Sequence, residues 1–348
     1  MDDLYIRNNI RLLKSIRGEK PDAHPFYLWF NFPFVKSVTG VDMDRYFHDP
    51  ATMFEAQLEL ISQLDGCAAF YPDFGVVPES SGLGGKIRFD NKGFISVSAS
   101  GINGMEDVRK MKPADPYGSN YMRKCLETLD YMKTHMPQGK GYALDAAKLV
   151  GPFTVAAQTY GITELCLEIY DNPDLVKALI DIAAETGIRF MKEQEKILGK
   201  LDYILIADDI AAFLSEKDFR EMVVPSYDRI FAEFPGVERR YHNDANAFHL
   251  AGAIADAGFS LWHMGHMFSI LDAAAKSDNR ITICGDLEPV VFAGLSEEEA
   301  ENACNELLTR FDGNTSLVLS TGGFFSYGTP IANVKALMRS ADQRKYSD

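Results

Sequence analysis

Two residues of types that commonly bind metals lie two positions apart near the end of an apolar run, His242 and Asp244. On an extended strand, residues i and i+2 point to the same face, so an imidazole nitrogen and a carboxylate oxygen would lie side by side. Cys284, in a later apolar run, has the same parity as Asp286 and would add a thiol on the same face of its strand. Zinc accepts nitrogen, oxygen and sulfur ligands. We therefore expect a zinc site on His242, Asp244 and Cys284.

A plainer interpretation of the same residues stays open. A histidine at a strand end is more often hydrogen-bonded or substrate-binding than a metal ligand. A lone cysteine such as Cys284 is more often a small buried apolar residue. A catalytic thiol needs a neighbouring base, and the sequence does not assign one.

Carboxylates follow other apolar runs. Asp73 ends one run, Glu79 comes shortly after it, and Asp208 ends another. These three are the expected acid–base residues. Asp209 would point away from Asp208 on an extended strand, so one of the two faces the site while the other caps a helix or pairs on the surface. Further polar residues near run ends are expected to bind substrate: Tyr160, Asp209, His263, His266 and Asp286.

Eight apolar runs of strand type could position these residues. They are Pro25–Asn31, Ala68–Phe74, Gly141–Val150, Tyr203–Ala207, Arg239–Asp244, Ser260–Met264, Ile281–Leu287 and Leu317–Thr321. Helical patterns with start and stop signals lie between them. The helices expected are Pro50–Leu64, Pro173 to about Lys200, Ser215–Phe234, Asn246–Ala257, Ser296–Phe311 and Pro330–Ser340.

This alternation predicts a single α/β domain over residues 1–348, a (β/α)8 TIM barrel with parallel strands inside and helices outside. An open doubly wound sheet is the alternative, but no GxGxxG follows the first strand. The Gly-rich stretch Pro78–Met111, with a hairpin over Lys86–Val97, is expected as an insertion after strand two, over the barrel mouth. Active sites of such barrels lie at the carboxyl ends of the strands, so the candidate residues should meet there.

Composition limits the partners and the compartment. The net charge of −15, without a cluster of Lys and Arg, argues against nucleic acid. No run approaches the roughly 20 apolar residues of a membrane span, and the N-terminus does not resemble a signal peptide. Five cysteines without CxxC spacing fit a reducing compartment, so we expect a cytoplasmic protein. The choice between a monomer and a homodimer stays open.

Several motifs, in order along nearly the whole chain, resemble those of the uroporphyrinogen decarboxylase superfamily. They are Arg17–Asp22, Gly151–Thr154 with Tyr160-Gly161, Asp208-Asp209 before Ser215–Tyr227, Gly285–Pro289 and Gly328–Val334. The resemblance implies a (β/α)8 barrel, in agreement with the number of strand-like runs.

What is missing indicates the branch of the superfamily. The decarboxylases carry an Arg-rich motif after strand one, which suits a substrate with many carboxylates. The corresponding stretch here, Trp29–Val35, has no arginine. The decarboxylase histidine near strand eight is replaced by Thr321–Phe324, although Asp73 matches the pyrrole-binding aspartate.

The other branch contains corrinoid-dependent methyltransferases. Its coenzyme M members bind zinc through H-x-C after strand five and a cysteine after strand eight. Here His242 matches, Asp244 replaces the first cysteine and Gly323 stands where the second is expected. The pattern therefore resembles the group that demethylates methyl ethers, whose zinc ligands are mixed.

The resemblance implies a methyltransferase that moves methyl from a small methoxylated donor to the cobalt of a corrinoid protein, with zinc as cofactor and the corrinoid supplied by that partner. Two alternatives are a decarboxylase of a smaller acid, using Asp73 and Tyr160, and a non-catalytic barrel that holds a corrinoid or tetrapyrrole.

Overall fold

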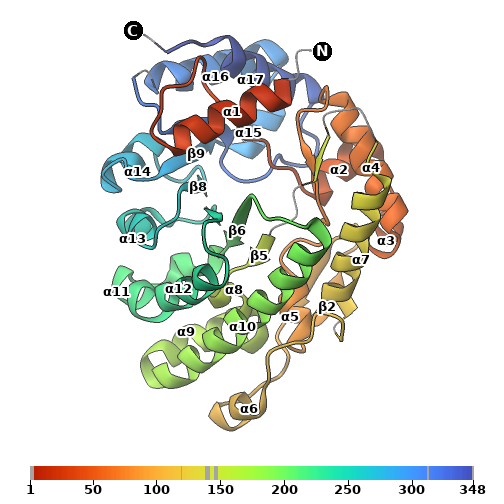
Figure 1. Ribbon diagram of the computed structural model, residues 1–348, viewed down its shortest axis with the longest axis vertical. Helices are drawn as coiled ribbons and strands as arrows, with labels where there is room; N and C mark the ends of the chain where they lie inside the picture. Colours follow the sequence, from red (N-terminus) through yellow and green to blue (C-terminus); the bar gives the residue numbers. More distant parts are fainter. Residues whose placement is uncertain (1–3, 119, 138–141, 145–147, 312, 347–348) are drawn as a thin grey trace.

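A parallel sheet curls through the centre of the molecule, and helices surround it (Figure 1). The computed structural model describes residues 4–118, 120–137, 142–144, 148–311 and 313–346. Six strands are hydrogen-bonded in sequence order, each to the next. They are β5 (Lys148–Val150), β6 (Tyr203–Ala207), β7 (Glu238–Asn243), β8 (Leu261–Met264), β9 (Thr282–Leu287) and β10 (Leu317–Thr321).

Shorter segments complete the barrel. β1 (Ala69–Phe70) pairs in parallel with β4 (Ala143–Leu144), and Phe26 forms a parallel bridge with Leu319 of β10. β4 and β5 occupy the same strand position, so the bridge at Phe26, β1 and the six-stranded sheet together give the eight strand positions of a (β/α)8 barrel, which confirms the predicted fold. All pairings between successive barrel strands are parallel because helices return the chain to the same end each time.

The later predicted strands coincide with observed ones to within one residue, whereas the first three differ. Pro25–Asn31 is reduced to the bridge at Phe26, and Ala68–Phe74 is reduced to β1, since Pro72 has no N–H for a ladder. The third prediction contains β4 and β5, while Gly141 and residues 145–147 lie outside the described residues.

The helices on the outside largely follow the predicted start signals. Asp49 accepts hydrogen bonds from two backbone N–H groups of the first turn of α4, and Ser296 forms a capping box with Glu299 on α16. The longer helices are α1 (Leu4–Ile16), α4 (Pro50–Gln63), α7 (Asn120–His135), α8 (Pro152–Tyr160), α9 (Ile162–Asp171), α10 (Pro173–Leu198), α16 (Glu297–Arg310) and α17 (Ile331–Gln343).

Two predicted helices are interrupted. The segment Ser215–Phe234 divides into α11 (Glu216–Asp218), a π-helical turn and α12 (Val224–Glu233). Pro225 lacks the N–H that would continue the α-helical pattern, so the preceding turn widens. The segment Asn246–Ala257 contains a 3-10 turn followed by α13 (Ala251–Asp256), which ends just before Gly258 in the left-handed conformation.

The insertion after strand two contains the predicted hairpin. β2 (Lys86–Phe89) pairs antiparallel with β3 (Ile95–Ser98), between the short helices α5 (Pro78–Gly82) and α6 (Met105–Lys110). Beyond the hairpin, the backbone N–H and the hydroxyl of Ser100 both donate to the carbonyl of Thr159, at 2.9 and 2.8 Å. These bonds anchor the insertion to the end of α8.

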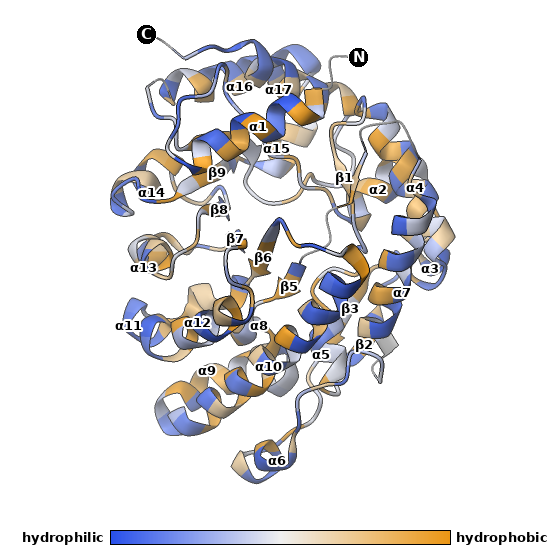
Figure 2. Ribbon diagram, in the orientation of Figure 1, coloured by the Kyte–Doolittle hydropathy of each residue, from blue (hydrophilic) through white to orange (hydrophobic). Residues whose placement is uncertain are grey.

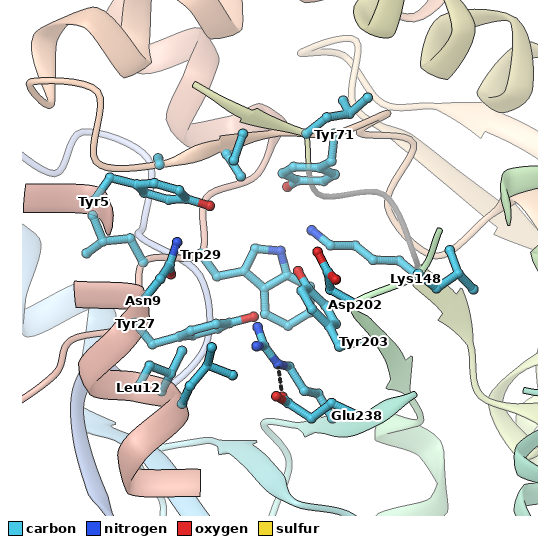
Figure 3. Close-up of a pocket in the computed structure, with 18 of the residues that line it drawn as sticks. Tyr5, Asn9, Leu12, Tyr27, Trp29, Tyr71, Lys148, Asp202, Tyr203 and Glu238 are labelled. Atoms are coloured by element: carbon cyan, nitrogen blue, oxygen red, sulfur yellow. Dashed lines mark hydrogen bonds and ion pairs between the residues drawn. The ribbon is translucent and has the colours of Figure 1, made fainter. Parts of the chain in front are cut away.

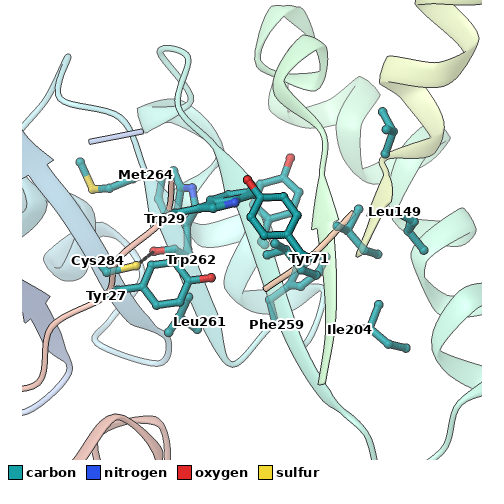
Figure 4. Packing of buried hydrophobic residues seen from close by; sticks show 14 of the residues in the cluster. Tyr27, Trp29, Tyr71, Leu149, Ile204, Phe259, Leu261, Trp262, Met264 and Cys284 are labelled. Carbon is teal, nitrogen blue, oxygen red and sulfur yellow. Dashed lines mark hydrogen bonds between the residues drawn. The ribbon is translucent and has the colours of Figure 1, made fainter. Parts of the chain in front are cut away.

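Apolar side chains are buried on the strands and on the inner faces of the surrounding helices. The outer helices carry both hydrophobic and hydrophilic residues, while β6 inside is coloured hydrophobic (Figure 2). Large aromatic side chains, including Tyr27, Trp29 and Tyr71, fill the region between the strands (Figure 4). Among the described residues, no helix combines the length and apolar character needed to cross a membrane.

Candidate active site

Three side chains at the carboxyl ends of β6 and β7 come together around one nitrogen. The Nε2 atom of His242 lies 3.7 Å from Oδ1 of Asp209 and 3.8 Å from Oδ2 of Asp244. One ligand atom from each residue can be chosen so that all lie within 4.8 Å of one another. Asp209 also accepts a hydrogen bond from the backbone N–H of Asp244, at 3.2 Å, which links the two strand ends.

The register between β6 and β7 explains why Asp209 and His242 lie close together. His242 pairs with Ala207 across β6 and β7, and Asp209 lies two residues beyond Ala207. The loop carrying Asp244 passes so close to its neighbours that they need glycine. A Cβ on Gly323, whose φ is +106°, would lie 2.8 Å from Oδ2 of Asp244. Gly323 therefore leaves the space that the Asp244 carboxylate occupies.

The geometry fits a divalent cation. Metal bonds of about 2.0–2.2 Å place neighbouring tetrahedral ligands about 3.4 Å apart, only slightly less than the two distances from His242. These distances are too long for direct N–H···O bonds. Nε2 of His242 is buried and has no hydrogen-bond partner among the residues that the structure describes. A buried nitrogen between two carboxylates is the arrangement that a bound cation would satisfy.

Aromatic rings and a second histidine enclose His242. Trp29 packs edge-on against its ring at a centroid distance of 4.3 Å, and Phe324 lies 5.6 Å away. Nδ1 of His242 is 3.0 Å from Nδ1 of His263, whose Nε2 is 3.0 Å from the carbonyl oxygen of Thr321. Burial lowers the pKa of His263 well below its ordinary value, so this ring is neutral.

Asp208 has a different environment from Asp209. It is fully buried, and its carboxylate accepts hydrogen bonds from the backbone N–H and hydroxyl of Thr154, both at 2.7 Å, and from the hydroxyl of Tyr227 at 2.7 Å. A Cβ on Gly151 would lie 2.1 Å from Cγ of Asp208, so the glycine before α8 makes room for this carboxylate. Asp208 thus stabilises the N-terminus of α8, and it does not line the cavity described next.

A cavity of about 320 Å³ lies beside the three-residue cluster at the barrel mouth. Asp209 and His242 of the cluster line it, as do Asp73, Glu79 and Lys148. Much of the remaining wall is apolar or aromatic: Trp29, Phe32, Tyr71, Val76, Ile95, Leu149, Val150, Phe190, Leu205, Ala207 and Phe324. Ile95 comes from the hairpin, which places this part of the insertion at the cavity, as the sequence predicted.

The two other carboxyl groups of the cavity are protonated easily. Burial raises the pKa of Asp73 to about 7, although the nearby Lys148 ammonium and the hydroxyl of Tyr46, at 3.2 Å, favour the charged form. Burial likewise raises the pKa of Glu79 to about 7, while the backbone N–H of Val150 donates to it at 2.9 Å. Both groups can therefore give or take a proton near neutral pH.

A second, larger cavity of about 1050 Å³ lies on the amino-terminal side of the strands, under α1 (Figure 3). Trp29, Tyr71 and Lys148 line both cavities. The Lys148 ammonium lies 3.4 Å from the centre of the Tyr71 ring and 5.1 Å from that of Trp29. These cation–π contacts form the boundary between the two spaces.

The structure separates several predicted site residues from the cluster. The Cys284 thiol donates to the carbonyl of Trp262, at 3.8 Å, and burial raises its pKa far above the ordinary range (Figure 4). Asp286 contacts Arg310 at 3.6 Å, His266 is exposed, and the Tyr160 hydroxyl donates to Glu168 at 2.9 Å. His263, in contrast, contacts His242 of the cluster, but it does not line the cavity.

Sequence reasoning assigned Asp209 to substrate and missed its place beside His242. Asp209 lies two residues after Ala207, so strand alternation could have suggested that both point to the same face. Only the pairing of β6 with β7 determines that Asp209 and His242 lie at the same height along the barrel axis. Lys148 and Trp29 were also missed, because a lone lysine or tryptophan in an apolar run carries no motif.

Comparisons with known proteins agree with the fold and assign the family. The family model for uroporphyrinogen decarboxylase (URO-D) matches residues 7–344. The uroporphyrinogen decarboxylase of Rhodococcus erythropolis is 26% identical over 306 residues, which cover 81% of this chain and 80% of that protein. The methylated-thiol–coenzyme M methyltransferase of Methanosarcina mazei is 22% identical over 279 residues, covering 80% and 73%. A solved structure of a methyltransferase from Methanosarcina mazei superposes with a TM-score of 0.81 at 20% identity, covering 97% of this chain and 98% of the other. The relatives are thus enzymes of two kinds on one fold.

Proposed function

Because this chain belongs to the uroporphyrinogen decarboxylase family, we propose that it is a methyltransferase of that family, which moves a methyl group from a small methoxylated donor to the cobalt of a corrinoid protein. The methyl–oxygen bond of the donor breaks, the methyl group passes to cobalt(I), and the donor oxygen keeps the electron pair and takes a proton. The reaction would take place in the cavity of about 320 Å³ at the barrel mouth.

The observation that carries the proposal is the cluster of His242, Asp209 and Asp244 at the edge of this cavity. These residues would hold zinc. When bound, the metal supplies a Lewis acid for the donor oxygen, which is a poor leaving group without one. The aromatic packing keeps water away from the ring of His242, and charge stabilisation is stronger beside a dry side chain than in water.

Asp73 and Glu79 provide the proton for the departing oxygen. Each has a pKa of about 7 and lies in the wall of the same cavity, so a protonated carboxyl is available at neutral pH. A neutral acid near the working pH is suited to protonating an oxygen as it leaves. Asp208, whose oxygens are bonded to α8 and Tyr227, has no part in this step.

The lining of the cavity argues against uroporphyrinogen as substrate. Of the described residues that line it, Lys148 is the one lysine or arginine. A substrate with many carboxylates needs several cations, and arginines bind carboxylates best. The aromatic walls and the modest volume suit a small donor, in which Lys148 could balance one negative charge.

Exposed apolar side chains follow four of the strands, and they support the binding of a protein partner at the barrel mouth. Phe213 follows β6, Met267 follows β8, Val290 follows β9 and Tyr327 follows β10, with exposed fractions of 58–71%. Side chains of this kind, at the end of the barrel that holds the site, are suited to burial against another protein. We propose that the corrinoid protein docks there.

The test combines metal analysis with an assay of methyl transfer. The freshly purified protein should contain about one zinc per chain, the His242→Ala variant should contain none, and only the former should methylate cob(I)alamin from a panel of methoxylated compounds. Failure of every methylated donor would reject the proposal. Release of carbon dioxide from a small acid without cobalt would instead support the decarboxylase alternative.

A further inference from the structure

A second histidine, His263, lies behind the candidate metal cluster and contacts His242, with 3.0 Å between their Nδ1 atoms. We infer that His263 is a positioning residue, which holds His242 in the tautomer whose Nε2 lone pair faces Asp209 and Asp244. The inference rests on the proposed function only in taking His242 as a ligand.

The backbone of Thr321 determines the position of the proton on His263. The carbonyl of Thr321 can only accept a hydrogen bond, so Nε2 of His263, 3.0 Å away, carries a proton. His263 is fully buried, and none of the described carboxylates forms an ion pair with it, so its ring carries the one proton on Nε2 and its other nitrogen, Nδ1, is an acceptor. Ser320, whose hydroxyl lies 3.5 Å from the same Nε2, donates to the carbonyl of Tyr27 and so does not displace this proton.

The acceptor on His263 in turn determines the tautomer of His242. Its Nδ1 lies 3.0 Å from the acceptor Nδ1 of His263 and must be the donor of that bond. In a neutral ring with a proton on Nδ1, the lone pair is on Nε2. This is the buried nitrogen that lies between the two carboxylates and has no hydrogen-bond partner among the described residues.

The direction of the hydrogen bonds from His242 through His263 to Thr321 determines which tautomer of His242 has the lower free energy. Without an acceptor behind it, His242 could place its proton on Nε2 and bond to Asp209 or Asp244, which would leave no lone pair for a metal. The bond from Nδ1 to His263 favours the other tautomer and fixes the plane of the ring. Partners of this kind, behind a metal-binding histidine, commonly change metal affinity by about 10- to 100-fold.

The experiment titrates the metal-free full-length protein with cobalt(II) alone and follows its visible absorption. His263→Phe keeps the aromatic packing against Tyr27 and Trp29 but removes both nitrogens. It should weaken cobalt(II) binding by about 10- to 100-fold. His263→Asn keeps an acceptor near Nδ1 and should recover part of the affinity. His249→Phe is the matched control, because Nε2 of His249 also bonds a backbone carbonyl, that of Leu214, outside the cluster, and cobalt(II) binding should not change.

A spectroscopic measurement tests the tautomer in the unmutated protein. Nitrogen-15 NMR of the metal-free form, recorded at a pH at which the His242 ring carries a single proton, should show that proton on Nδ1 and none on Nε2. A proton on Nε2, or folded His263→Phe protein with unchanged cobalt(II) affinity, would overturn the inference. If His263→Phe does not fold, the NMR result decides. If the cobalt(II) affinities and the His242 tautomer are as expected but the unmutated protein transfers no methyl group, only the proposed function is rejected.

Discussion

Asp208 and Asp209 are adjacent in the chain, yet their carboxylates serve different structures. Asp208 Oδ1 is 2.7 Å from the backbone nitrogen of Thr154 at the start of α8, whereas Asp209 Oδ1 is 3.7 Å from Nε2 of His242. The first bond joins β6 to the helix after β5, and the second contact belongs to the candidate metal cluster. The two aspartates should therefore respond differently to mutation.

Asp208→Ala is expected to destabilise the fold. It removes the acceptor for the first turn of α8 and for the buried hydroxyls of Thr154 and Tyr227. A lost cap and lost buried hydrogen bonds together cost about 2–4 kcal/mol of the free energy of unfolding. Urea denaturation would measure this loss, with Asp209→Asn as the control of nearly unchanged stability. An unchanged midpoint for Asp208→Ala would show that the cap contributes little.

Metal content should depend on Asp209 and not on Cys284. Asp209→Asn removes a charged oxygen beside His242, so bound zinc should fall from about one per chain to a small fraction. Cys284→Ala should retain the metal, because the thiol bonds to the carbonyl of Trp262 away from the cluster. Elemental analysis of both purified variants gives the answer. Metal loss in the Cys284→Ala variant would instead support the prediction from the sequence that the Cys284 thiol is a zinc ligand.

Gly323→Ala is expected to weaken metal binding by at least about 10-fold. The new Cβ would lie 2.8 Å from Oδ2 of Asp244 and would displace this carboxylate from His242. Gly328→Ala is a matched control, since that glycine also has a positive φ but has no atom within 4 Å of the added Cβ. Cobalt(II) titration compares the two. Equal affinities would mean that the contact between the new Cβ and Asp244 does not affect metal binding.

Glu79→Gln should change how stability varies with pH. The pKa of Glu79 is raised from 4.5 to about 7 in the folded state, so its stabilising contribution is complete below about 4.5 and is lost as the pH rises through about 7. The variant has no charge to bury but can still accept from the N–H of Val150. Its free energy of unfolding relative to the unmutated protein should therefore rise by up to roughly 3 kcal/mol between about pH 4.5 and about pH 8.

Denaturation at several pH values measures this difference. Glu55→Gln, at an exposed position on α4, is the control and should give a flat difference across the same range. A flat difference for Glu79→Gln as well would mean that Glu79 titrates in the folded protein as it does in water.

Much of the fold follows from local sequence signals. Apolar runs separated by capped helices determine the β–α alternation, and the capping box at Ser296 and Glu299 begins α16 where the sequence predicts. The insertion could also be predicted, because a Gly-rich stretch with a hairpin pattern interrupts that alternation. The break before Pro225 was missed, since a pattern of apolar residues does not distinguish an α-helical turn from a π-helical one.

The sequence alone determined that His242 and Asp244 share a face, because alternation along a strand is a local property. Only the tertiary structure decided that Asp209 joins them, that Cys284 does not, and that His263 supports His242 from behind. The physical reason is that parity gives the face of a strand but not the depth in the barrel. Depth depends on the register between neighbouring strands and on the close packing at residues such as Gly323, which no single stretch of sequence specifies.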